Sequence, residues 1–140
     1  MSRAEIETFF TRYRDAFNRL DGDAVADLWH VPCGITDGAE VTWWSEDSTM
    51  RANHRALCAV YAAADYARAD FEIVHAHAMG ANDAFVHIHW ALQRRDGTLL
   101  QRFGTGYNLR RTPGGPKVLL ATAYAENLSA MKKETRHAAQ

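Results

Sequence analysis

Residues 71–126 read FEIVHAHAMGANDAFVHIHWALQRRDGTLLQRFGTGYNLRRTPGGPKVLLATAYAE, a series of strand-like runs separated by short turns. The runs are Phe71–Met79, Ala84–Gln93, Leu99–Arg111 and Lys117–Glu126. Because the turns are short, consecutive strands should be antiparallel neighbours. Gly104 and Gly106 lie two apart within one run, where paired glycines mark a bend or a bulge. The sequence therefore predicts a strongly curved, mixed or antiparallel sheet.

Two helices are predicted at the start of the chain. Ser2-Arg3-Ala4-Glu5 has the form of a capping box, so the first helix should begin there and run to about Leu20. After Asp21-Gly22, Asp23 is placed to cap a short second helix through residue 29 or 30, and Pro32 should end it.

A short strand pair and a third helix complete the pattern. The strands are Cys33–Thr36 and Val41–Trp44, joined around Asp37-Gly38, a dipeptide that favours tight turns. The third helix should begin at residue 47 or 48 and end before Asp70. This order of elements predicts a single α+β domain over residues 1–128, with a polar C-terminal tail over residues 129–140.

A polar residue interrupts the apolar stripe of each long helix. The first stripe consists of Ile6, Phe9, Phe10, Tyr13, Phe17 and Leu20, and the second of Met50, His54, Leu57, Tyr61 and Ala64. A hydroxyl or an imidazole that is buried without a partner costs about 1–3 kcal/mol. Tyr13 and His54 must therefore find partners in the core or face a cavity, and the sequence leaves both outcomes open.

The composition excludes several classes of function. The 140 residues carry a formal net charge of −1 with dispersed lysines and arginines, so we expect no nucleic-acid partner. The N-terminus lacks a signal-peptide pattern and no apolar run reaches the roughly 18 residues of a membrane span, so we expect no membrane partner and a cytoplasmic protein. Cys33 and Cys58 show no metal-type spacing, and we expect neither a metal nor a cofactor.

The order of helices and strands resembles that of the nuclear transport factor 2-like superfamily, which includes ketosteroid isomerase and the SnoaL-like polyketide cyclases. The matching motifs are Asn18–Asp23 after the first helix, Leu28-Trp29, and Tyr107–Arg111 before a Gly-rich turn and Lys117-Val118-Leu119. The resemblance implies a cone, in which the curved sheet wraps around three N-terminal helices and encloses an apolar pocket. It also implies a homodimer through the outer face of the sheet.

The resemblance to ketosteroid isomerase extends to two candidate catalytic residues. Arg12-Tyr13 followed by Ala16-Phe17-Asn18 is similar to the context of its catalytic tyrosine, and Ile35-Thr36-Asp37 to that of its catalytic aspartate. In that chemistry a carboxylate moves a proton beside a carbonyl while hydroxyl or protonated carboxyl donors hold the enolate oxygen. The protonated aspartate of that enzyme has no counterpart in Gly104-Thr105-Gly106-Tyr107, so steroid isomerisation itself is not expected.

These features lead to two hypotheses of different class. In the first, the chain binds a small apolar or aromatic molecule and is an acid–base enzyme of the isomerase, dehydratase or cyclase type, in which Asp37 or His54 moves a proton and Tyr13 polarises an oxygen. In the second, it is a non-catalytic ligand-binding or dimerisation module, Asp37 is only a turn residue, and Tyr13 and His54 are satisfied core residues. The expected pocket lining is Phe17, Trp29, Trp43, Tyr61, Trp90, Phe103 and Tyr107.

Four histidines on neighbouring strands also require a test for metal binding. If Ala81-Asn82 is a two-residue loop, His75 and His77 lie on the opposite face of the sheet from His87 and His89. A one-residue bulge would instead bring all four to one face. We expect the first arrangement, with one pair facing the core and the other facing outward, and no metal site.

Overall fold

The sheet contains six strands in the order β2-β1-β6-β5-β4-β3. The computed structural model describes residues 1–126. The strands are β1 (Trp29–Asp37), β2 (Glu40–Trp44), β3 (Tyr66–Met79), β4 (Asp83–Arg94), β5 (Leu99–Thr112) and β6 (Gly115–Tyr124). Neighbouring strands are antiparallel except β1 and β6, which run parallel. The sheet is therefore mixed, as predicted.

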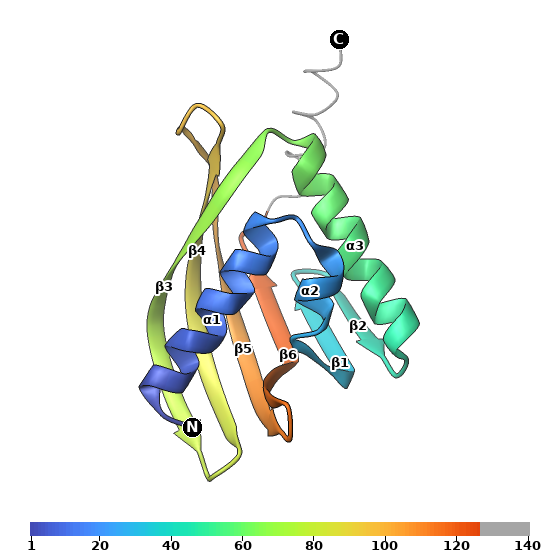
Figure 1. Cartoon of the computed structure of the whole chain (residues 1–140), viewed down its shortest axis with the longest axis vertical. Coiled ribbons are helices and arrows are strands. Elements are labelled where there is room, and N and C mark those ends of the chain that lie inside the picture. Colours follow the sequence, from blue (N-terminus) through green and yellow to red (C-terminus); the bar gives the residue numbers. More distant parts are fainter. Residues whose placement is uncertain (127–140) are drawn as a thin grey trace.

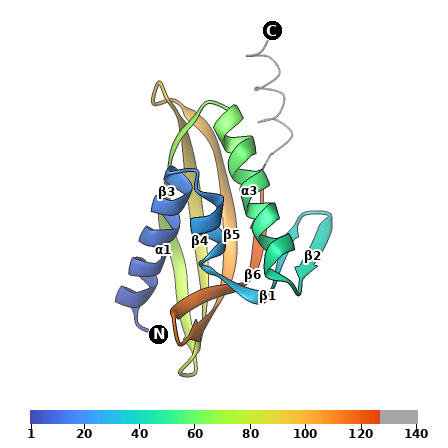
Figure 2. The same ribbon diagram turned by 45° about the vertical axis from the view of Figure 1, so that its right-hand side comes forward.

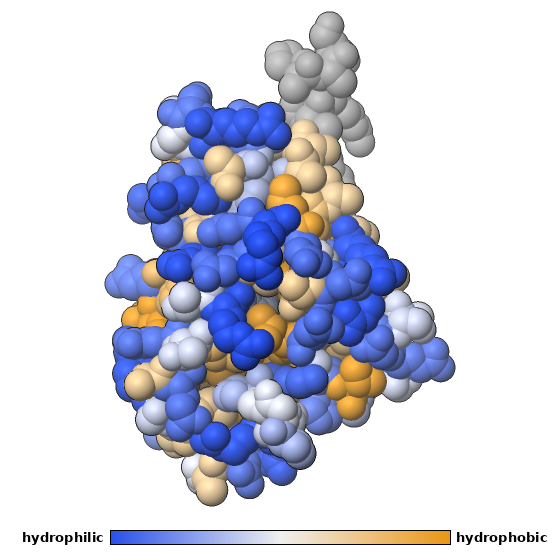
Figure 3. Space-filling view, viewed as in Figure 1, coloured by the Kyte–Doolittle hydropathy of each residue, from blue (hydrophilic) through white to orange (hydrophobic). Residues whose placement is uncertain are grey.

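Three helices lie against one face of this curved sheet (Figures 1 and 2). They are α1 (Arg3–Asn18), α2 (Gly22–Ala26) and α3 (Asp47–Ala63). The exterior of the helix-covered side is largely hydrophilic (Figure 3), because the apolar stripes of α1 and α3 turn toward the sheet. The α+β fold with a curved sheet around N-terminal helices confirms the predicted fold class.

Helix α1 begins as predicted, and α2 does not. Ser2 and Glu5 form the reciprocal hydrogen bonds of a capping box. At α2, however, the capping side chain is Asp21, which accepts a hydrogen bond from the backbone N–H of Ala24. The carboxylate of Asp23 instead binds arginines of α3, so it is not available to the helix end.

Helix α2 is also shorter than predicted, because the backbone turns into β1 at Trp29. Pro32 does not end a helix; it lies inside β1. A proline is tolerated there because the pairing of β1 with β6 is interrupted between Trp29 and Gly34, so the strand has no ladder hydrogen bond to lose.

The hairpin between β3 and β4 differs from the predicted one. Its loop has three residues, 80–82, with Met79 opposite Asp83, so the two-residue loop was wrong. His75 therefore lies opposite His87, and His77 lies opposite Phe85. Buried residues alternate along β4 from Ala84 to Leu92, which places His87 and His89 on the outer face. All four histidines share that face, and the expected split into an inner and an outer pair was also wrong.

The predicted tail over residues 129–140 lies outside the described residues, as does the predicted domain boundary at residue 128. Within the described part of the chain, no helix has the length and apolar character needed to span a membrane.

Candidate functional site

A cavity of about 300 Å³ lies between the helices and the concave face of the sheet. Every predicted site residue except Trp43 contributes to its wall: Tyr13, Phe17, Trp29, Asp37, His54, Tyr61, Trp90, Phe103 and Tyr107. These side chains come from both long helices and from strands of the sheet, so the fold brings them together from distant parts of the sequence.

Trp43 points away from the cavity, and the prediction that it lines the pocket was wrong. In the β1–β2 hairpin Ile35 pairs with Thr42, and both line the cavity. Trp43 is the next residue along β2 and therefore faces the outer side, where its ring lies over Gly34. The neighbouring Trp44 lines the cavity instead.

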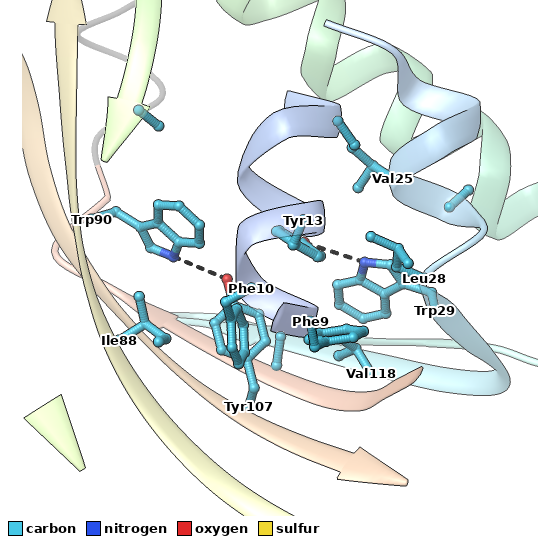
Figure 4. Close-up of a cluster of buried hydrophobic side chains, with 14 of the residues drawn as sticks. Phe9, Phe10, Tyr13, Val25, Leu28, Trp29, Ile88, Trp90, Tyr107 and Val118 are labelled. Atoms are coloured by element: carbon cyan, nitrogen blue, oxygen red, sulfur yellow. Dashed lines mark hydrogen bonds between the residues drawn. The ribbon is translucent and has the colours of Figure 1, made fainter. Parts of the chain in front are cut away.

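Two buried tyrosines line the cavity, and the hydroxyl of each is hydrogen-bonded to a tryptophan (Figure 4). The Tyr13 hydroxyl accepts a hydrogen bond from Trp29 Nε1 at 3.3 Å, and the Tyr107 hydroxyl accepts one from Trp90 Nε1 at 3.0 Å. The two hydroxyls also hydrogen-bond to each other, so one hydroxyl hydrogen of the pair remains for a ligand. Burial raises the pKa of both tyrosines, so both remain protonated donors at neutral pH.

Tyr107 lies in the stretch where the family resemblance implied a missing donor. Its ring centroid is 5.8 Å from that of Tyr13, so the two hydroxyl-bearing rings are neighbours. A phenol thus stands close to the position at which the sequence comparison found no carboxyl group.

His54 is buried on the cavity wall, with an exposed fraction of 1%. Neither ring nitrogen has a hydrogen-bond partner among the described residues, and the ring lies against Trp29 with a centroid distance of 4.7 Å. Burial, assisted by the nearby Arg51 charge, lowers the pKa of His54 to about 4. The imidazole is therefore neutral at pH 7 and offers one donor and one acceptor.

Asp37 lies at the end of β1, with its side chain exposed at the cavity wall. It also begins the predicted tight turn, since Gly38 has a φ of +60° and Asp37 pairs with Glu40. The turn role and the site role are therefore compatible in one residue.

Glu126 is a candidate site residue that the sequence did not reveal. Its Oε1 accepts a hydrogen bond from the Tyr61 hydroxyl at 2.6 Å, and it lines the cavity. Burial and the nearby Asp37 carboxylate raise the pKa of Glu126, while the Tyr61 hydrogen bond opposes this shift.

The backbone at Ala125 explains why sequence alternation fails to identify Glu126. Ala121 and Ala123 face the cavity, so strict alternation would turn residue 126 outward. Ala125 adopts a φ of +61°, which ends the strand and reverses the direction of the following side chain.

The four histidines of the outer face form pairs rather than a metal site. The rings of His75 and His77 are stacked at 6.1 Å, those of His87 and His89 lie edge to face at 5.1 Å, and His87 Nε2 contacts the Tyr124 hydroxyl. Over residues 1–126, no group of three or more histidine, cysteine or acidic side chains has a geometry that could hold a metal ion.

Comparison with known proteins identifies the family. The family described as NTF2-like protein (DUF6841) matches residues 4–126, and the chain belongs to it. No curated protein matches the sequence.

Solved structures support the same fold. A protein of unknown function from Shewanella oneidensis has a TM-score of 0.71 at 15% identity, covering 89% of this chain and 99% of that one. A protein of unknown function from Mycobacterium tuberculosis has a TM-score of 0.73 at 14% identity, covering 97% and 87%. A ketosteroid isomerase-like protein from Erwinia carotovora atroseptica has a TM-score of 0.63 at 17% identity, covering 86% and 93%. At these identities the likeness establishes the fold and no activity.

Proposed function

We propose that the chain binds a small, mainly apolar carbonyl compound in the cavity and moves a proton beside its carbonyl group, as an enzyme of the isomerase, dehydratase or cyclase type. The observation that carries the proposal is the pair of buried hydroxyls on Tyr13 and Tyr107, which accept hydrogen bonds from two indole N–H groups, are bonded to each other and keep one hydrogen for a ligand. Such donors stabilise an oxygen on which negative charge develops.

The proposed chemistry also needs a general base. Asp37 or His54 accepts a proton from the carbon beside the carbonyl, and the electron pair of that C–H bond moves toward the ligand oxygen. The oxygen then receives a hydrogen bond from the paired tyrosine hydroxyls. Returning the proton to another carbon would complete an isomerisation, and loss of a neighbouring hydroxyl as water would complete a dehydration.

Two probes with the same bicyclic skeleton test this proposal. 2-Tetralone is an apolar ketone with exchangeable α-hydrogens, and 2-naphthol resembles its enol. We expect exchange of the 2-tetralone α-hydrogens in D₂O, followed by NMR, to be faster with the protein than in buffer. We expect 2-naphthol to quench the fluorescence of the cavity tryptophans.

Variants then distinguish the residue that stabilises the ligand oxygen from the residue that accepts the proton. Tyr13→Phe should slow the exchange about 10²- to 10³-fold, the range for loss of one oxyanion donor. Asp37→Asn and His54→Gln identify the base, because only loss of the base should abolish exchange while 2-naphthol still binds. Trp43→Phe, on the outer face, is the control and should leave the exchange rate unchanged. Exchange no faster than in buffer for the unmodified protein would refute the proposed chemistry.

A non-catalytic ligand-binding module is the second candidate. The observation that favours it is the cavity wall itself, which is built mainly from apolar and aromatic side chains, with Asp37 exposed to solvent. Binding of 2-naphthol without any exchange of 2-tetralone would support this function over the first.

A homodimer through the outer sheet face and a cytoplasmic location belong to the same proposal. Trp43, Val74 and Tyr124 are exposed apolar or aromatic side chains, and Trp43 and Tyr124 lie over glycines of the outer face. A second copy would cover such a surface. Light scattering should give twice the mass of 15.7 kDa, and Trp43→Glu should restore the monomer mass.

A further inference from the structure

The charged groups of the cavity wall are all acidic. Asp37 and Glu126 line the cavity, whereas the described lining residues include no lysine and no arginine. His54 is neutral at pH 7, since its pKa is lowered to about 4. An anionic ligand would therefore meet two carboxyl groups and no counter-ion.

The guanidinium of Arg51, close to the cavity wall at His54, is already paired with carboxylates. Arg51 precedes His54 by one turn of α3 and forms ion pairs with Asp23 at 3.3 Å, Asp27 at 2.8 Å and Asp47 at 3.1 Å. Three carboxylates pair with this one guanidinium and compensate its charge.

A second observation points to a polar group on the ligand. The buried His54 ring lies on the wall with both nitrogens unpartnered among the described residues. In its neutral form one nitrogen is a bare acceptor, which a ligand N–H would satisfy, and the other is a donor, which a ligand oxygen would satisfy.

The aromatic wall also suits a positive charge. Tyr61, which donates to Glu126, stacks on Tyr66 with ring centroids 5.4 Å apart, and Trp44 and Trp90 lie elsewhere on the same wall. The faces of such rings attract ammonium groups, and the attraction grows as water is excluded.

We propose that the ligand of this cavity carries a protonated amine on an apolar ring, with the ammonium group placed against the Glu126 carboxylate. This inference rests on the proposed ligand-binding function and adds the charge of the ligand to it. Glu126 then serves as the anchor, and Tyr61 positions its carboxylate through the 2.6 Å hydrogen bond. Within residues 1–126, Asp37 and the Tyr13 and Tyr107 hydroxyls are the other titratable groups that act on Glu126 or are influenced by it, and none of them carries positive charge.

A matched series of probes tests the charge preference directly. The probes are 2-aminotetralin, 2-tetralol and tetralin-2-carboxylate, which share one bicyclic skeleton and are cationic, neutral and anionic at pH 7. Dissociation constants are measured with the unmodified protein by tryptophan fluorescence or calorimetry. We expect the amine to bind at least tenfold more tightly than the alcohol, and the alcohol more tightly than the carboxylate.

A variant that lacks the carboxylate of Glu126 tests whether this residue binds the ammonium group. Glu126→Gln should reduce the advantage of the amine to less than threefold and leave the affinity for the alcohol within about twofold. Glu72→Gln, on β3 away from the cavity wall, is the matched control and should leave the preference unchanged. Circular dichroism establishes that each variant is folded. If Glu126→Gln does not fold, the order of the three dissociation constants in the unmodified protein still decides the proposal.

The outcomes separate this inference from the proposed function. Equal affinity for amine and alcohol, or an amine advantage that persists in Glu126→Gln, overturns the inference, and exchange of 2-tetralone would still support the proposed function. A clear amine preference without any exchange supports the inference and refutes the proposed chemistry. If none of the three probes binds, the inference is overturned, and the proposed function is judged by 2-naphthol binding and 2-tetralone exchange.

Discussion

His54 should make the stability of the protein strongly dependent on pH. Its pKa in the folded protein is about 4, against 6.5 for an ordinary histidine, because its ring is buried. Between these two values the unfolded chain binds a proton on this residue and the folded chain does not. The free energy of unfolding should therefore fall as the pH is lowered from about 6.5 to about 4, and His54 should contribute no such loss above pH 6.5.

The size of the effect follows from the same two pKa values. Each pH unit below 6.5 costs about 1.4 kcal/mol until the folded-state pKa is reached. At pH 5.0 the penalty is therefore about 2 kcal/mol, and below pH 4 it levels off near about 3 kcal/mol. Solvent screens the ring little, since the side chain is 1% exposed.

Urea denaturation at pH 7.5 and pH 5.0 measures this penalty when the unmodified protein is compared with His54→Phe. The variant fills a similar volume and cannot be protonated. The difference in unfolding free energy between the two proteins should shift by about 2 kcal/mol in favour of the variant on going to pH 5.0. His89→Phe, at an exposed position, controls for the loss of a histidine. A shift below about 0.5 kcal/mol would show that His54 becomes protonated in the folded state without penalty, and the argument from burial would fail.

Two further predictions concern the packing of the helices and the two thiols. Gly22→Ala should lower the free energy of unfolding by about 1–3 kcal/mol, because its Cβ would lie 2.6 Å from the Arg55 Cα, whereas Gly114→Ala, with its nearest atom at 3.8 Å, should be nearly neutral in the same urea titration. Cys33 and Cys58 are buried and burial raises the pKa of each to about 11, so at pH 8 a thiol reagent should react at least about 100-fold more slowly with the native protein than in urea. Equal rates in both conditions would contradict the burial of the thiols.

Features set by local sequence were predictable. The capping box at Ser2, the apolar stripe that carries Tyr13 and the turn at Asp37-Gly38 each depend on residues a few positions apart, and the structure contains all three. Tyr13 and His54 were also expected either to find partners or to face a cavity. In the structure both residues line the cavity. Tyr13 also has a hydrogen-bond partner, whereas His54 has none among the described residues.

The predictions of side-chain direction failed where a shift of one residue in strand pairing, or one backbone angle, decides which face of the sheet a side chain takes. An additional residue in the β3–β4 loop moves His75 and His77 to the outer face, and the pairing of Ile35 with Thr42 turns Trp43 outward. Glu126 reaches the cavity through the left-handed backbone of Ala125. These details depend on how strands that are far apart in the sequence pair with one another. A short stretch of sequence does not contain that information.

The position of β6 in the sheet has a consequence for how the protein is made. This last strand of the described chain lies between β1 and β5, and the β1–β2 hairpin is joined to the rest of the sheet through it. Gly34 pairs with Trp43 within the hairpin, and it gains its second partner, Leu120, only when β6 has been made. During synthesis the early hairpin exposes an unpaired strand edge until nearly all of the described chain has left the ribosome. Such an edge is a site at which nascent chains aggregate or recruit chaperones.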